Sequence, residues 1–320
     1  MLRTRFTELL GCSVPIQLAA MPGVVTPELA IAVSEAGGLG MISAMRLSPQ
    51  GLSDLLDFIQ ARTAKPVGVN FLMPFLDRDG LVAAAAKGRV VEFFYGDPDS
   101  DLVKLAHRNG ALVSWQIGSA EEAVAAERAG CDFIVAQGVE SGGHIRGTNG
   151  ILPLLSSILD TVGVPVLAAG GIGTARDLAA VVAAGASGAR LGTRFLACAE
   201  SGAHPAYVDA IIKSRAEDTV VTETFSATWP HAPHRVLRAC VEAANSSQRS
   251  TVAEMQVNGS KLSIPRFGSP APTKDTVGAI EAMALYAGQS VTAVTSIESA
   301  AQIVKELAEG AQKLLKPDEK

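Results

Sequence analysis

The stretch PIQLAAMPGVVTPELAIAVSEAGGLGMIS, residues 15–43, contains the repeating unit that predicts the fold. An apolar run at 15–20 is followed by a helical segment after Thr26 and by a second apolar run at 39–43. Thr26 is a typical N-cap, and Pro27 suits the first helical position because proline has no N–H to donate. Two glycines follow the helix, where glycine readily adopts the left-handed conformation. The stretch therefore predicts a strand, a helix and a second, parallel strand.

The same alternation continues along the chain. Short apolar runs predict six further strands, at 66–71, 90–95, 111–116, 132–137, 164–171 and 188–193. Amphipathic stretches between most of these runs predict helices. Continuous apolar runs are typical of strands that are buried on both faces of a parallel sheet. Eight such strands predict an α/β fold, a (β/α)8 TIM barrel formed by residues 1–204.

The alternation ends after residue 204. Residues 205–289 read as mostly helical, with one β-like run at 218–225 and connections rich in Ser and Pro. We predict that they form a smaller insertion subdomain after the eighth strand, which acts as a lid over the barrel mouth. Residues 290–320 predict a C-terminal helix that packs back on the barrel.

Composition excludes several classes of function. The chain has 320 residues, 48% of them hydrophobic, and a net charge of −5, which argues against a nucleic-acid partner. The first residues lack the long apolar segment of a signal peptide, and no apolar run is long enough to span a membrane. We therefore expect a cytoplasmic protein with no membrane partner.

Cysteine and histidine spacing predicts neither a metal site nor a disulfide. Cys12, Cys131, Cys198 and Cys240 are widely scattered, which indicates reduced thiols. His231 and His234 are three residues apart, but the prolines of WPHAPHR interrupt any helix that could align them. We assign these two histidines to a loop, and no metal is expected.

The active site of a barrel of this kind lies at the carboxyl ends of its strands. The motifs AAGGIG and GARLGT place glycine turns after the seventh and eighth strands, where backbone N–H groups can hold a phosphate. The alternative is that these glycines only form tight turns. GIGTAR lacks the acidic partner of a dinucleotide fingerprint, so it does not predict a Rossmann site.

The loop VAQGVESGGHIRG, residues 135–147, follows the sixth strand and contains His144. Its length and glycines would let the loop reach over the barrel mouth. Imidazole is the side chain best suited to proton transfer near neutral pH. His144 is therefore either a side chain directed at a bound ligand or a loop histidine without a chemical task.

The motifs AAMPG, GVN, VAQGVESGGHIRG, AAGGI and LGTRFLA together resemble the nitronate monooxygenase family, formerly called 2-nitropropane dioxygenases. The resemblance extends over about residues 5–200 and returns at YAGQS, 286–290. It implies a barrel that binds FMN without a covalent bond. The family also includes FMN-dependent enoyl-acyl carrier protein reductases and NADH:quinone reductases.

The resemblance also implies residue roles. His144 would be the catalytic base. The implied cofactor-binding residues are Ala20, Met21, Pro22, Asn70, Gln116, Gln137, Gly142, Gly143, Gly170, Gly171, Arg190, Gly192, Thr193 and Gln289. Two departures bear on the subfamily: Arg190 stands where the family usually has glutamine, and GGHIRG is one residue longer than the GGHRG of many nitronate enzymes.

Three functions remain open at this point. The first is a nitronate monooxygenase that oxidises nitronates or small nitroalkanes with O2 as co-substrate. The second is an NAD(P)H-dependent FMN reductase acting on an enoyl thioester or a quinone. The third is a non-redox barrel that binds a phosphorylated metabolite. We also expect a homodimer.

Overall fold

Eight parallel strands form the barrel that the sequence predicts. The computed structural model describes residues 2–257 and 259–316. The strands, in sheet order, are β1 (Ile16–Leu18), β9 (Gly188–Leu191), β8 (Val166–Ala169), β6 (Phe133–Gln137), β5 (Leu112–Ile117), β4 (Val90–Phe94), β3 (Val67–Leu72) and β2 (Gly40–Ser43). The Leu39 N–H donates to the Ile16 carbonyl, and the Leu18 N–H donates to the Leu39 carbonyl, both at 2.9 Å. These bonds join the first and last strands, so the sheet closes.

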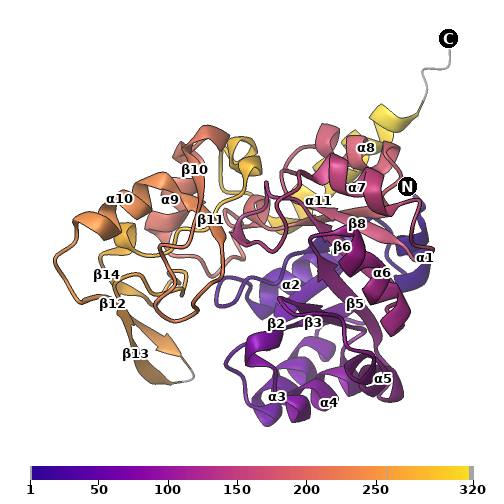
Figure 1. Cartoon of the computed structure of the whole chain (residues 1–320), viewed down its shortest axis with the longest axis horizontal. Helices are drawn as coiled ribbons and strands as arrows, with labels where there is room; N and C mark the ends of the chain where they lie inside the picture. Colours follow the sequence, from indigo (N-terminus) through magenta and orange to yellow (C-terminus); the bar gives the residue numbers. More distant parts are fainter. Residues whose placement is uncertain (1, 258, 317–320) are drawn as a thin grey trace.

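Helices surround the barrel (Figure 1). They are α2 (Pro27–Glu35), α3 (Pro49–Gln60), α4 (Arg78–Lys87), α5 (Ser100–Arg108), α6 (Ala120–Ala129), α7 (Ile151–Ile158), α8 (Ala175–Ala183) and the C-terminal α11 (Ala300–Leu315). The Thr26 hydroxyl accepts a hydrogen bond from the Leu29 N–H at 3.0 Å, which confirms the predicted N-cap. Helix α11 contacts α8 and α2 and so packs against the barrel.

A short helix that the sequence analysis missed, α1 (Arg5–Leu10), closes the amino-terminal end of the barrel. Its Phe6 is fully buried and packs edge-on against Phe133, with 5.6 Å between ring centroids. Phe6 and Leu10 share one apolar cluster with inward-facing residues of five barrel strands or strand ends. Because this end is filled, the opposite end, where the strands finish, is left for a ligand.

Residues 205–289 contain more strand than predicted. Their elements are α9 (Pro205–Lys213), β10 (Thr219–Thr222), β11 (His234–Leu237), α10 (Arg238–Ser246), β12 (Thr251–Val257), β13 (Ser260–Pro265) and β14 (Val277–Gly278), with short 3-10 turns. The expectation of a mostly helical segment is corrected: strands β12 and β13 pair antiparallel. The signal was present, because apolar and polar residues alternate on both sides of an Asn-Gly pair, a typical hairpin pattern.

This second part has its own apolar core. Tyr207, Phe225 and Val236 are buried in a cluster that also takes in Val24 and Leu196 from barrel loops. Figure 1 shows the part (orange) beside the barrel. The division into 1–204, 205–289 and 290–320, with a lid in the middle, stays a proposal.

All four cysteines are free thiols. Within 2–257 and 259–316, no helix has both the length and the apolar character needed to cross a membrane.

Candidate functional site

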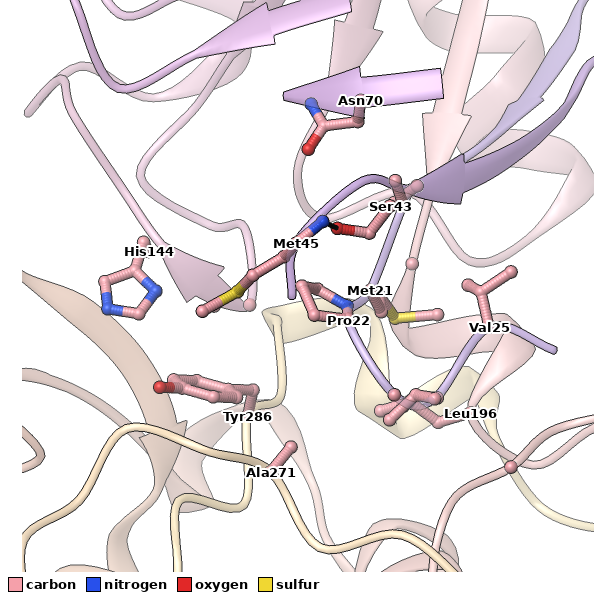
Figure 2. Close-up of a pocket in the computed structure, with 18 of the residues that line it drawn as sticks. Met21, Pro22, Val25, Ser43, Met45, Asn70, His144, Leu196, Ala271 and Tyr286 are labelled. Carbon is pink, nitrogen blue, oxygen red and sulfur yellow. Dashed lines mark hydrogen bonds between the residues drawn. The ribbon is translucent and has the colours of Figure 1, made fainter. Parts of the chain in front are cut away.

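A cavity of about 600 Å³ opens at the carboxyl ends of the barrel strands. Figure 2 shows Met21, Pro22, Asn70, His144 and Tyr286 around it. Cavities of this size are typical of sites for small ligands and cofactors. Residues 255–257 and 269–275 of the second part complete the wall, so both parts of the chain form the site.

The structure brings together almost all of the predicted site residues. Those that line the cavity are Ala20, Met21, Pro22, Asn70, Gln116, Gln137, Gly142, Gly143, His144, Gly170, Gly171, Arg190, Gly192 and Thr193. Gln289 is the exception: its side chain is exposed, and its backbone N–H donates to the Glu140 carbonyl at 2.9 Å. Its neighbours Gly288 and Ser290 line the cavity instead.

The glycine turn after β8 has a backbone that other residues rarely adopt. Gly170 has a φ of +110° and Gly171 a φ of +72°. A Cβ atom at Gly170 would also lie 2.6 Å from the Ser141 hydroxyl oxygen. After β9, the Thr193 hydroxyl accepts a hydrogen bond from the Gly288 N–H at 2.9 Å. Both turns lie at neighbouring strand ends, the arrangement expected for a phosphate site.

His144 is held firmly, although the glycines around it suggest a flexible loop. It forms a short strand, β7 (Gly143–His144), that pairs antiparallel with His234 and Arg235 of β11. The Gln137 side-chain amide donates to the His144 carbonyl at 2.9 Å. The position of the imidazole is therefore set by the second part of the chain as well as by the barrel.

Arg146, two residues after His144, anchors the other end of the loop after β6. The Arg146 guanidinium forms ion pairs with Glu122 and Asp97. Charge-assisted hydrogen bonds to arginine are directional and relatively strong. They tie the loop after β6 to the loop after β4 and to α6.

Aromatic rings enclose the His144 imidazole. It stacks on Trp229, with ring centroids 4.0 Å apart and an angle of 28° between the planes. Tyr286, Tyr95 and His234 lie 5.5, 6.0 and 5.3 Å away by the same measure. Burial, and secondly the proximity of His234, lower the pKa of His144 to about 3. The imidazole is therefore neutral across the physiological pH range.

His234 is fully buried and already hydrogen-bonded at both ring nitrogens. Its Nε2 accepts from the Phe225 N–H at 3.2 Å, which leaves Nδ1 to donate to the Ala232 carbonyl at 2.8 Å. Burial lowers the pKa of His234 as well. It is a neutral residue that positions His144, rather than the loop residue that the sequence analysis expects.

Several site residues were missed from sequence. Trp229 and Tyr286 come from irregular segments with no periodic signal. Glu92 lies within the apolar run of β4, yet its Oε1 is 2.6 Å from Nη1 of Arg190. A charged residue inside such a run is the one sign that could have drawn attention to it, because buried carboxylates need partners.

The residues present fit a flavin-like ligand. Three buried polar atoms of the cavity wall have no hydrogen-bond partner within the described chain: Gln137 Oε1, Ser141 Oγ and His144 Nε2. Leaving such atoms unpaired is costly, so a ligand or water is expected to pair with them. Together with the glycine turns, they suit a planar polar ring that carries a phosphate. The described residues contain no cluster of metal-ligating side chains.

Comparisons with known proteins agree with this geometry. The family model described as nitronate monooxygenase matches residues 3–79 and 76–310. A probable nitronate monooxygenase from Staphylococcus aureus (strain MRSA252) is 33% identical over 270 residues, which span 70% of this chain and 76% of the relative. The structure of FabK from Thermotoga maritima matches with a TM-score of 0.81 at 32% identity, over 98% of both chains. A nitroalkane oxidase from Streptomyces ansochromogenes matches with a TM-score of 0.76 at 30% identity, over 97% of this chain and 100% of the relative.

Proposed function

This chain belongs to the nitronate monooxygenase family of oxidoreductases, and from that premise we propose that it binds FMN and oxidises nitronates or small nitroalkanes with O2. The observation that carries the proposal is the His144 imidazole. It is neutral, it lies in the cavity wall, and its Nε2 has no partner within the described chain.

The strand-end residues have distinct tasks in this proposal. Gly170, Gly171 and Thr193 would hold the phosphate, because their turns lie side by side at the ends of β8 and β9. Asn70 and Gln137 would contact the polar edge of the ring from β3 and β6. When bound, FMN would supply the electron-accepting centre and the reactivity with O2.

The enclosed aromatic wall selects a small substrate. Trp229 and Tyr286 pack around His144, and Met21 and Met45 add apolar surface to the cavity wall, with the Met45 side chain drawn towards His144 in Figure 2. With a neutral nitroalkane, the proton of the carbon beside the nitro group would pass to a ring nitrogen of His144. Burial around that nitrogen excludes water from the transfer.

The low pKa of His144 favours nitronates over neutral nitroalkanes. A base is most effective when its pKa is close to the working pH, so an imidazole with a pKa of about 3 accepts a proton poorly. A nitronate has already lost that proton. Its negative charge would also raise the pKa of His144 and make the imidazole a better hydrogen-bond donor to the bound anion.

A second candidate is the NAD(P)H-dependent FMN reductase. The cavity extends along Met255–Val257 and Ser269–Asp275, and both Arg46 and Lys274 line it. Both side chains are exposed, and two such cations suit a second phosphate-bearing ligand. The non-redox alternative is dropped, because the family consists of oxidoreductases.

Purification and turnover test the proposal. The protein should be yellow, and FMN should be released when it is denatured. In air it should consume O2 on addition of a nitronate, without NADH or NADPH. A protein that stays colourless after reconstitution with FMN would refute the flavin assignment. Turnover that depends on NADH would favour the reductase.

A further inference from the structure

A carboxylate lies in the interior of the barrel, directly below the cavity. Glu92 is fully buried. Its Oε1 accepts from Nδ2 of Asn70 at 3.0 Å and pairs with Nη1 of Arg190 at 2.6 Å. Its Oε2 accepts from Nε2 of Gln17 at 3.0 Å and from the Ser114 hydroxyl at 3.4 Å. Strands β3, β9, β1 and β5 thus all contribute a partner to this one carboxylate.

Stability alone is a poor explanation for this pair. Removing two charges from water is costly, and well-packed apolar residues of similar volume often stabilise a protein core as much as a buried ion pair or more. Nearer the amino-terminal end, around Phe6 and Phe133, the barrel interior is filled with apolar side chains instead. The position of the pair relative to the cavity gives a functional reason instead.

Only the positive member of the pair reaches the cavity. Arg190 is one of its lining residues, and Glu92 is not. The pair is neutral as a whole, but its cationic end faces the ligand and its anionic end faces the protein interior. In a site of low dielectric constant, such an orientation produces a positive potential at the ligand.

The pair also fixes two side-chain amides. Gln116 Oε1 accepts from Nη1 of Arg190, so its NH2 group remains to donate. Asn70 donates through Nδ2 to Glu92, so its oxygen remains to accept. Both residues line the cavity, and Figure 2 shows the Asn70 oxygen turned towards the other labelled residues. The cavity wall therefore offers a ligand one acceptor (Asn70), one donor (Gln116) and one cation (Arg190), each held in place by the ion pair.

We infer that Arg190 raises the reduction potential of the bound flavin and that Glu92 is the residue that positions it, an inference that rests on the proposed binding of FMN. The ring of oxidised FMN is neutral. It becomes an anion when it takes up two electrons and one proton, the electrons coming from the substrate or from an added reductant. A cation against the ring binds the reduced form more tightly than the oxidised form.

The midpoint potential of bound FMN, measured by anaerobic titration with dithionite and a reference dye, tests this directly. In Arg190→Gln the affinity for reduced FMN relative to oxidised FMN should fall at least tenfold, which lowers the potential by about 30 mV for a two-electron couple. In Glu92→Gln the cation loses its counter-charge, so the potential should rise. The double variant should lie between the two.

Arg194 provides a matched control. It is also a buried arginine in an ion pair, with Glu298 at 3.2 Å, but it does not line the cavity. Arg194→Gln should leave the potential unchanged. Arg190→Lys, which keeps the charge, should retain most of the wild-type potential. If Arg190→Gln does not fold, Glu92→Gln tests the inference alone, because it should still raise the potential.

The outcomes separate this inference from the proposed function. Shifts of the same sign in Arg190→Gln and Glu92→Gln, or no shift in either, would make the pair merely structural and overturn the inference. Wild-type protein that binds no FMN would instead overturn the proposed function. Dissociation constants for FMN, from the quenching of its fluorescence, separate a change in potential from a general loss of binding.

Discussion

His144 should remain uncharged far below the pH at which an ordinary histidine becomes protonated. Its ring is stacked on Trp229, its Nε2 is buried, and its pKa is lowered to about 3 by burial and by His234. An imidazole with a pKa of 6.5 is about 76% neutral at pH 7 and about 3% neutral at pH 5, a loss of about 25-fold. With a pKa of about 3, it stays about 99% neutral at pH 5.

Nuclear magnetic resonance of protein labelled at its five histidines measures this directly. The His144 signal, assigned by its absence in His144→Gln, should not titrate between pH 8 and 4.5. Trp229→Ala should expose the ring and move the midpoint towards 6.5. Phe75→Ala is the control, because Phe75 packs edge-on against Trp229, with ring centroids 5.2 Å apart, and its loss should leave the stack of Trp229 on His144 in place. A wild-type midpoint between 6 and 7, or no response to Trp229→Ala, would refute the reasoning.

The lowered pKa of His144 should also make the free energy of unfolding depend on pH. The folded-state pKa of His144 lies below the unfolded value of 6.5, so the unfolded chain takes up the proton first as the pH falls. The stabilisation is complete above pH 6.5 and is lost between 6.5 and about 3, at up to about 1.4 kcal/mol per pH unit. His144→Asn should remove this part of the pH dependence of unfolding by urea. An unchanged slope would contradict the assigned pKa.

Three further predictions concern catalysis, cofactor binding and the second part of the chain. His144→Ala should keep FMN and lose on the order of 10²-fold or more in turnover of a neutral nitroalkane, but much less with a preformed nitronate; equal losses in kcat with both substrates would make His144 a residue that only positions the ligand. Gly171→Asp should abolish retention of FMN, because a side chain is strained at a φ of +72° and the added carboxylate repels the phosphate; unchanged flavin absorbance would place the phosphate elsewhere. Residues 205–289 expressed alone should not unfold cooperatively, because their core includes Val24 and Leu196 of the barrel; a cooperative transition, together with full activity of the remainder, would refute the lid.

The barrel could be predicted from the sequence because its strands are continuous apolar runs. The run 39–43, for example, becomes β2 at Gly40–Ser43, and 90–95 becomes β4 at Val90–Phe94. The second part could not be predicted in the same way. In its paired strands β12 and β13, apolar residues alternate with polar ones instead of forming a continuous run, because only one face is buried.

The candidate site also contains residues that the sequence predicts and residues that it does not. Residues directly after a strand, such as Asn70 and Gly171, follow from the rule that strand ends meet at one face. Trp229 reaches His144 only through the fold of the second part, and no local pattern marks it. Glu92 was hidden in an apolar run, and Gln289 was carried over from a motif although only its neighbours line the cavity.

Anaerobic mixing of the purified, oxidised protein with a nitronate tests the central claim most directly. The flavin absorbance near its visible maximum should bleach within the time of one turnover, without any pyridine nucleotide, and return when O2 is admitted. NADH or NADPH alone should leave the spectrum unchanged. Bleaching by NADH or NADPH, with no response to the nitronate, would contradict the account and identify the protein as a reductase.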